Sequence, residues 1–274
     1  MAGGDRAGEV PPLPEPLPDG VTCTDSHCHL DIADRPVGEV LAQASSVGMT
    51  RVVTIGTDLP SSRWAAATAA AYDGVRAAVA VHPDAAATVT DEDLRELEAL
   101  AGRPEVRAVG ETGLDHFHTT TTEGWALQEL AFRAHIAIAK SAGVALVIHD
   151  RDAHDDVLRV LAEEGAPEHT VFHCFSGDVA MARLCADRGY VMSFAGNTTF
   201  KNAGGLREAA AVVPAGQLLV ETDAPFLTPV PWRGRPKAPA LVPLTLRLLA
   251  EVRGVDVAAL AADADATATR VFGP

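Results

Sequence analysis

The chain has 274 residues, of which 47% are hydrophobic and 22% charged, and this composition is typical of a soluble globular protein. The formal net charge of −15, from 37 acidic and 22 basic residues, argues against broad electrostatic binding of nucleic acid. This net charge does not exclude a small site at which metal ions and a few arginines supply local positive charge. No apolar run is long enough to indicate a membrane span.

A proline-rich stretch begins the chain. Residues 1–20 contain prolines at positions 11, 12, 14, 16 and 18, and they lack the apolar stretch of a signal peptide. We expect a disordered leader over residues 1–20, followed by a single domain over residues 21–274.

After the leader, short β-branched runs alternate with alanine-rich helical stretches. The runs predict eight strands, at Val21–Ser26, Arg51–Ile55, Val75–Val81, Val106–Gly110, Val144–Ile148, Thr170–Phe172, Tyr190–Phe194 and Gln217–Val220. Most are nearly continuous apolar runs, as expected of strands that are covered on both faces.

The stretches between and after the strands predict helices, several of which begin at the capping residues Thr90, Thr122 and Asp178. The predicted helices are Pro36–Val47, Pro60–Tyr72, Asp91–Ala101, Thr122–Ala142, Asp152–Glu164, Asp178–Arg188, Asn202–Val213, Pro239–Arg253 and Val255–Phe272. Eight strands alternating with helices predict an α/β fold, a (β/α)8 TIM barrel. The main alternative is an open doubly wound sheet, which the lack of a GxGxxG motif after the first strand disfavours.

Histidine and carboxylate side chains stand at the carboxyl ends of six of these strands. In a barrel those ends converge on one mouth, where barrel active sites lie. The residues are His27 and His29 after the first strand, His82 after the third, Glu111 after the fourth, His149 after the fifth, His173 after the sixth and Asp223 after the eighth. Convergence from so many separate segments is hard to explain by packing.

The His27-Cys28-His29 spacing strengthens this interpretation. Residues i and i+2 of an extended chain point to the same side, so His27 and His29 can hold one ion while Cys28 points away. Nitrogen and carboxylate ligands without cysteine suit Mg²⁺, Mn²⁺ or Zn²⁺ in a catalytic role. The ligands exceed what one ion takes with an open position, so we predict two ions that share a carboxylate, an arrangement suited to phosphoester cleavage.

Several neighbouring polar residues have more than one possible role. Asp115 could orient a ligand or cap its loop, and His82 could contact either metal or substrate. His116 and His118 follow in the same loop as Asp115 and could face the mouth, whereas three histidines in or near helices are expected to be surface or structural residues: His135, His154 and His169.

The segment from Arg233 to Lys237 has three cations in five residues of an otherwise acidic chain, and it follows the eighth strand. Gly234 and Pro236 favour an ordered loop over a helix. Arg233 and Lys237 are therefore predicted to bind the substrate backbone.

Five segments, taken in order, resemble motifs of the TatD family of metal-dependent deoxyribonucleases, which belongs to the amidohydrolase superfamily. They are Thr24-Asp25-Ser26-His27-Cys28-His29-Leu30-Asp31, Gly110-Glu111-Thr112-Gly113-Leu114-Asp115, Val147-Ile148-His149-Asp150-Arg151, His173-Cys174-Phe175-Ser176-Gly177 and Glu221-Thr222-Asp223-Ala224-Pro225. The resemblance runs from about Val21 to the end of the chain. Lys237 departs from it, because it stands where the family usually has asparagine.

The resemblance implies a role for each matching residue. His27, His29, Glu111 and Asp223 would hold one ion, and Glu111, His149 and His173 a second, with Glu111 bridging. Asp223 would also orient and deprotonate the attacking water. His82, in Val81-His82-Pro83, matches a position near the substrate phosphate, and Arg151 matches a basic residue after the fifth-strand histidine.

The resemblance also implies an activity, namely hydrolysis of DNA phosphodiester bonds by metal-activated water, often exonucleolytic, in the cytoplasm. The expected substrate is DNA with single-stranded or frayed ends, without an obligate protein partner. Two alternatives are an amidohydrolase or esterase acting on a small molecule, and a metal-bound scaffold or quality-control factor without catalysis. Glu111 stands where related amidohydrolases often have a carbamylated lysine, which favours the nuclease.

Overall fold

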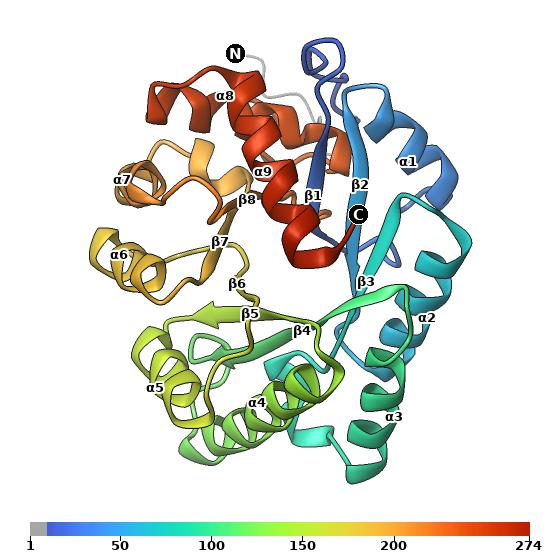
Figure 1. Ribbon diagram of the computed structural model, residues 1–274, viewed down its shortest axis with the longest axis vertical. Helices are drawn as coiled ribbons and strands as arrows, with labels where there is room; N and C mark the ends of the chain where they lie inside the picture. The colour runs from blue at the N-terminus through green and yellow to red at the C-terminus, as the bar shows by residue number, and fades with distance from the viewer. Residues whose placement is uncertain (1–9) are drawn as a thin grey trace, which may run out of the picture.

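The computed structural model describes residues 10–274, which form a (β/α)8 TIM barrel (Figure 1). Eight parallel strands form one sheet in chain order. They are β1 (Cys23–Cys28), β2 (Met49–Ile55), β3 (Val75–Val79), β4 (Val106–Asp115), β5 (Ala145–Arg151), β6 (Thr170–Phe172), β7 (Val191–Phe194) and β8 (Leu218–Val220).

Helices alternate with the strands and cover the outside of the sheet (Figure 1). They are α1 (Val37–Ser45), α2 (Leu59–Ala71), α3 (Asp91–Ala101), α4 (Thr122–Ala142), α5 (His154–Glu164), α6 (Val179–Asp187), α7 (Gly204–Val212), α8 (Val242–Arg253) and α9 (Val257–Phe272). Among the described residues, no helix is both long and apolar enough to span a membrane.

The barrel closes between its last and first strands, directly beside two of the candidate ligands. The Asp223 backbone N–H donates to the His27 carbonyl at 2.8 Å, and the His29 N–H donates to the Ala224 carbonyl at 2.8 Å. Cys28 and Ala224 form a parallel bridge between these two hydrogen bonds. Backbone pairing therefore fixes the position of the first-strand histidines relative to Asp223.

The eight predicted strands are confirmed, but β1, β4 and β5 extend beyond their predicted ends. The pairing of these two strands continues from Thr112–Ile148 to Asp115–Arg151. Gly113 makes the extension possible, because its φ is +135° and a Cβ there would lie 2.1 Å from the His149 carbonyl oxygen. The apolar run ends earlier than the strand because β4 continues with the polar residues of the site.

The helix predictions are also confirmed, with small changes at the ends. Helices α3 and α4 have the predicted bounds, and Thr90 and Asp178 cap α3 and α6. The cap of α4 is Thr121, whose side chain accepts from the Gly124 N–H, and not Thr122. The predicted helix Pro239–Arg253 begins with a 3-10 turn over Pro239–Leu241 before α8.

The proline-rich leader differs from the prediction where the structure describes it. Residues 1–9 lie outside the described residues. Leu17 is buried, and its N–H donates to the Val47 carbonyl at 3.1 Å, while Arg247 donates to the Pro16 carbonyl at 2.8 Å. The prediction of disorder therefore does not hold for the residues around Leu17, because an apolar side chain and its backbone find partners on the barrel.

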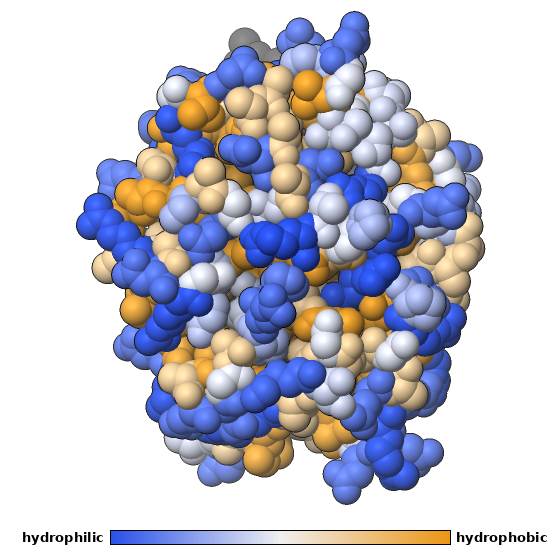
Figure 2. Space-filling model, viewed as in Figure 1, coloured by the Kyte–Doolittle hydropathy of each residue, from blue (hydrophilic) through white to orange (hydrophobic). Residues whose placement is uncertain are grey.

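Helix α9 and the C-terminus lie across the end of the barrel at which the strands begin. Arg51, near the start of β2, donates to the Gly273 carbonyl, and Arg76, near the start of β3, contacts the Pro274 carbonyl. This helix lies in front of the strands in Figure 1. Figure 2 shows the same face of the molecule, where hydrophilic residues alternate with smaller apolar areas. The candidate site lies at the other end of the strands.

Candidate metal centre

A pocket of about 950 Å³ opens at the carboxyl ends of the strands. Six of the seven strand-end candidates line it: His29, His82, Glu111, His149, His173 and Asp223. His27 lies beneath it and is completely buried. The fold thus brings together the seven residues that the sequence placed at strand ends.

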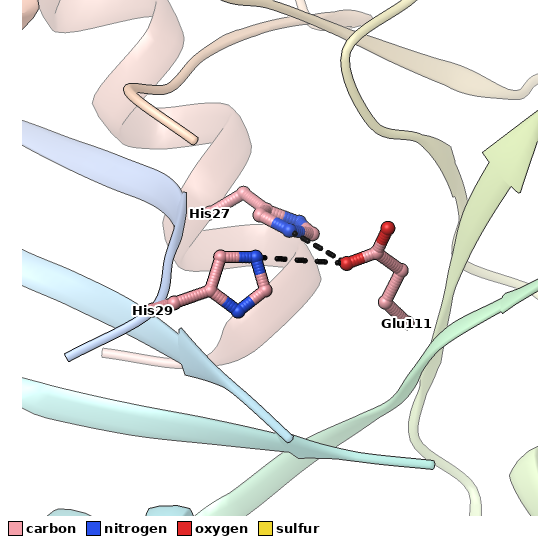
Figure 3. Close-up of side chains that lie close together, drawn as sticks. All are labelled: His27, His29 and Glu111. Carbon is pink, nitrogen blue, oxygen red and sulfur yellow. Dashed lines mark ion pairs between the residues drawn. The ribbon is translucent and has the colours of Figure 1, made fainter. Parts of the chain in front are cut away.

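The first group of ligand atoms gathers at the end of β1. The imidazoles of His27 and His29 both point toward the Glu111 carboxylate (Figure 3). Their Nε2 atoms lie 3.2 Å and 3.7 Å from Glu111 Oε2. The same two nitrogen atoms lie 3.9 Å and 3.5 Å from Asp223 Oδ1. Two nitrogens and two oxygens therefore surround one point.

The second group gathers on the other oxygen of the same glutamate. His149 Nδ1 lies 2.9 Å from Glu111 Oε1, and His173 Nε2 lies 3.1 Å from it. His82 Nε2 is the third nitrogen, at 3.4 Å. Glu111 therefore presents one oxygen to each group, as a carboxylate that bridges two ions would.

Two further carboxylates lie behind the histidines of the second group. Asp115 Oδ2 is 2.9 Å from His149 Nε2, and Glu221 Oε1 is 3.3 Å from His173 Nδ1. A carboxylate on the far nitrogen fixes the tautomer and the orientation of a ligating histidine. The sequence left the role of Asp115 open, and the structure gives it both roles, because Asp115 Oδ1 also accepts from the N–H groups of Phe117 and His118.

The Glu221 contact was not predicted. The sequence nevertheless indicated that Glu221 could reach the site. Glu221 and Asp223 are two residues apart after an extended strand, and residues at that spacing face the same side. Asp25 holds the intervening Thr222 on the other side by accepting from its N–H and its hydroxyl. Asp25 also accepts from the His27 N–H. This buried carboxylate links the β1 ligands to the β8 ligand.

The arrangement of these side chains fits a divalent ion. His27 is completely buried, its Nδ1 has no hydrogen-bond partner among the described residues, and its Nε2, although 3.2 Å from Glu111 Oε2, is not aligned for a hydrogen bond. A buried nitrogen without a partner is costly unless it binds something. Moreover, the spacings of 3.2–3.9 Å in the first group are close to the roughly 3.4 Å between ligands of a tetrahedral ion with bonds of about 2.1 Å.

The charges in the metal-free site are balanced by protons on histidines. Burial lowers the pKa of His149, but hydrogen bonds to Asp115 and Glu111 outweigh this effect and raise it to about 9. Burial also opposes the raised pKa of His173, which Glu111 and Glu221 keep well above its usual value. Burial and the nearby His173 lower the pKa of His27, which favours a neutral imidazole.

Binding of a divalent ion near neutral pH is therefore expected to release protons. A histidine must be neutral to bind metal, and His149, with a pKa of about 9, is protonated below that pH in the metal-free protein. Metal affinity should rise with pH through the range in which His149 and His173 lose their protons. Titration calorimetry at neutral pH, in buffers of different ionisation enthalpy, should show the release of roughly one to two protons per chain. Equal heats in all buffers would contradict the prediction.

The residues predicted to contact the substrate occupy different places. His82 and Arg151 line the pocket. Arg151 is exposed, and its guanidinium carbon lies 4.2 Å from the centre of the Phe117 ring. Arg233 is also exposed, with its guanidinium carbon 4.3 Å from the centre of the Phe200 ring. The structure leaves these three side chains open to a ligand.

Lys237 does not lie at the mouth as predicted. It is only 8% exposed, and its ammonium donates to the carbonyls of Thr222 and Leu227. Burial lowers the pKa of Lys237 to about 8, although Asp223 and Asp25 oppose the shift. The loop folds inward at Lys237. The ammonium group of this residue therefore holds the loop against the end of β8 and does not face the substrate.

Replacing Lys237 by Ala is therefore expected to reduce stability and leave the salt dependence of KM unchanged. The change removes a charged donor from two buried carbonyls, which should lower the free energy of unfolding by about 1.5–3 kcal/mol. Arg233→Ala is the matched control, because it removes an exposed cation from the same loop. It should leave stability unchanged, raise KM for the substrate expected from the sequence, single-stranded DNA, and flatten the dependence of KM on salt. Denaturant unfolding with KM at several salt concentrations checks both, and a change of salt slope in Lys237→Ala would contradict the buried assignment.

The remaining histidines lie outside the two ligand groups. His135 is buried, with Nδ1 2.8 Å from the Thr112 hydroxyl, and burial lowers its pKa to about 4. His154 Nδ1 lies 2.7 Å from Asp150 Oδ2 at the start of α5. His118, at the edge of the pocket, could join Asp84 and Asp115 around a cation, but its Nδ1 and the His149 ring already occupy Asp115 Oδ2.

The pocket is strongly acidic. Seven carboxylate side chains line it, and Arg151 is the one lysine or arginine among its described lining residues. An anionic substrate would be repelled from this pocket unless bound cations reversed the local charge. Divalent ions would therefore be needed to admit an anion as well as to activate it.

Comparison with known proteins places this architecture among metal-dependent hydrolases. The family model described as TatD related DNase matches residues 24–273. The chain is 46% identical to an uncharacterized metal-dependent hydrolase TatD of Mycobacterium tuberculosis, over 83% of this chain and 89% of that protein. It is 37% identical to a protein of Cronobacter sakazakii named 3'-5' ssDNA/RNA exonuclease TatD, over 87% of this chain and 92% of that protein. Among solved structures, YjjV, a TatD homologue from Escherichia coli K12, superposes with a TM-score of 0.86 at 26% identity, covering 92% of this chain and 98% of its own.

Proposed function

Because this chain belongs to the TatD related DNase family of metal-dependent hydrolases, we propose that it cleaves the phosphodiester bonds of DNA from a single-stranded end. The observation that carries the proposal is the position of Glu111 between two groups of ligand atoms. Its Oε2 faces His27 and His29, and its Oε1 faces His149 and His173. A carboxylate shared in this way suits two ions, and paired ions suit phosphodiester hydrolysis.

Each ligand has a place in the proposed centre. His27, His29, Glu111 and Asp223 would hold one ion, and Glu111, His149 and His173 the other, as Mg²⁺, Mn²⁺ or Zn²⁺. When bound, the ions would lower the pKa of water and neutralise phosphate oxygens. His82 and Arg151 line the same pocket and would contact the substrate phosphates. Arg233 would contact a phosphate further along the bound DNA strand.

Asp223 is the proposed general base. Burial alone would raise its pKa, but hydrogen bonding to His29 and the positive charge of nearby histidines such as His173 outweigh that effect and lower it. The carboxylate is therefore ionised at neutral pH and can orient an attacking water and accept its proton. The Asp223 carbonyl accepts a hydrogen bond in the turn after β8, and the Asp223 N–H donates one across the barrel closure. The residue is therefore already in place to act on a water.

Two features support the choice of substrate and location. A relative is named as an exonuclease of single-stranded DNA and RNA, and 37% identity over most of both chains makes the same substrate class a reasonable expectation here. The four cysteines of the chain are unpaired in the structure, as is usual for proteins of a reducing cytoplasm.

Hydrolysis of labelled single-stranded DNA in the presence of Mg²⁺ or Mn²⁺ tests the proposal. A linear oligonucleotide should be shortened from one end, and a circular single strand of the same sequence should resist. Placing the label on either end gives the polarity. Cleavage of the circle would replace the exonuclease with an endonuclease. Inertness toward both, with turnover of small esters or amides, would favour the small-molecule hydrolase.

A further inference from the structure

Two exposed aromatic rings lie at the active end of the barrel: Phe226 lines the pocket, and Phe117 contacts the lining residues Arg151 and His118. Of the eight phenylalanines in the chain, Phe226 and Phe117 are the two that are exposed, at 53% and 54%. Each follows the carboxyl end of a strand, Phe117 after β4 and Phe226 after β8. Single exposed apolar residues are common, but the gathering of both exposed phenylalanine rings at the active end of the barrel suggests a ligand.

Phe226 lies beside the first group of ligand atoms. Its N–H donates to the Asp223 carbonyl at 2.7 Å, and its ring centre lies 5.9 Å from that of His29 in an edge-to-face arrangement. It lines the same pocket as Glu111. A flat group resting on this ring would therefore lie next to the ligand atoms of His29 and Asp223.

Phe117 is held beside the lining residues Asp115 and Arg151, after β4. Its N–H donates to Asp115 Oδ1 at 2.9 Å, and Arg151 stacks on its ring with the guanidinium carbon 4.2 Å from the centre. In the strand order of the barrel, β4 and β8 are separated by three strands on either side, so the loops that follow them stand opposite one another. A strand that crosses the mouth between them would meet both rings.

The charge of the pocket indicates which part of a nucleic acid these rings would bind. With seven carboxylates and one arginine in its lining, the pocket offers few direct contacts to phosphates. Apart from the phosphate held by the bound ions, affinity for the rest of a polynucleotide must then come largely from its bases. Stacking on aromatic side chains provides such affinity for every base, because each base has a flat face.

We propose that Phe226 and Phe117 are base-stacking platforms for a single-stranded nucleic acid, with Phe226 holding the base beside the scissile phosphodiester. The proposal rests on the nuclease function proposed above and adds the subsite that selects the substrate. Paired bases inside a duplex have both faces covered by their neighbours, so the platforms would favour unpaired ends. Stacking does not read base identity, so cleavage would be tolerant of sequence.

The test combines ring removal with base removal. The variants are Phe226→Ala and Phe117→Ala, with Phe226→Trp retaining a ring and Leu130→Ala, an exposed residue on α4, as the matched control. Each is assayed with Mg²⁺ on single-stranded DNA, either intact or with one abasic residue placed at successive positions from the cleaved end. Binding is followed separately by the fluorescence of 2-aminopurine placed at the same positions, since stacking quenches it.

We expect Phe226→Ala to raise KM for intact DNA by about 5- to 100-fold, with a much smaller change in kcat. An abasic residue beside the scissile bond should raise KM of the wild type similarly and have little further effect in Phe226→Ala. Phe117→Ala should likewise raise KM for intact DNA, and an abasic residue further along the DNA strand should have little further effect in that variant. Phe226→Trp should retain the fluorescence quenching that Phe226→Ala loses.

The outcomes separate the two proposals. Unchanged KM and unchanged quenching in both alanine variants would overturn the platforms while leaving the nuclease intact. Quenching by a wild-type protein that does not cleave DNA would overturn the nuclease and retain the platforms. A wild-type protein that neither quenches nor cleaves would overturn both.

Discussion

Replacing Asp223 by Asn is expected to lower kcat by about 10²–10⁴-fold while most of the substrate affinity remains. The amide keeps the size and shape of the carboxylate, but it cannot accept a proton from water. It also removes one negative charge from the group formed with His27 and His29, whose nitrogens lie 3.9 Å and 3.5 Å from Asp223 Oδ1. A weakened metal site would add to the loss of the base.

Asp152→Asn is the matched control for this variant. Asp152 also lines the pocket and is exposed, but it does not belong to either group of ligand atoms. Removing its charge tests whether the acidity of the pocket alone limits the rate. We expect kcat within about threefold of the wild type for Asp152→Asn. If Asp223→Asn stays within the same range at saturating metal, Asp223 is not the base.

The architecture was predictable because its signal is local and repeated. Eight apolar runs such as Val106–Gly110 alternate with helical stretches, and a barrel is the arrangement that buries such runs on both faces. The rule that an apolar run marks a strand placed the end of β4 too early, because the last residues of that strand are buried but polar. Glu111, Thr112 and Asp115 belong to β4 although they interrupt its apolar pattern, because the active end of a barrel strand is lined by polar side chains.

The ligand groups were predictable for a related reason. Placing a residue at the end of a barrel strand places it in the mouth, so His27, Glu111 and His173 could be assigned from the order of strands alone. Contacts made by loops were not accessible in this way. Lys237 lies in a segment rich in proline, arginine and glycine, and nothing local indicates that the segment turns inward at that residue and buries its ammonium against the carbonyls of Thr222 and Leu227.

Removing divalent ions by chelation is expected to abolish cleavage and to weaken binding of single-stranded DNA, yet to leave the barrel folded. The loss of cleavage follows from the proposed chemistry. The loss of binding follows from the lining of the pocket, in which seven carboxylates outnumber one arginine and the protonated His149 and His173. Placing phosphates among unneutralised carboxylates costs several kcal/mol, so Kd should rise by more than about tenfold.

The fold should survive because its core does not depend on the site. Phe132, Phe172 and Phe194 are completely or almost completely buried, and the sheet is continuous from β1 to β8. In the metal-free protein, protons on His149 and His173 compensate the charge of Glu111, so the ligands need not separate. The loss of bound ions should still lower the free energy of unfolding, by about 2.7 kcal/mol for each ion that was present at 100 times its Kd.

Three measurements on one chelated sample check this prediction: circular dichroism for the fold, fluorescence anisotropy of labelled single-stranded DNA for binding, and product analysis for cleavage. Binding should be measured at two ionic strengths, because salt screens the carboxylates and should partly restore the affinity of the metal-free protein while weakening that of the metal-loaded one. Opposite effects of salt on the affinity of the two forms would show that the metal-free pocket repels phosphates, and not only that it has lost the ions that bind them. Full activity after chelation would contradict the metal mechanism, and affinity that is unaffected by chelation would show that the substrate does not enter the acidic pocket.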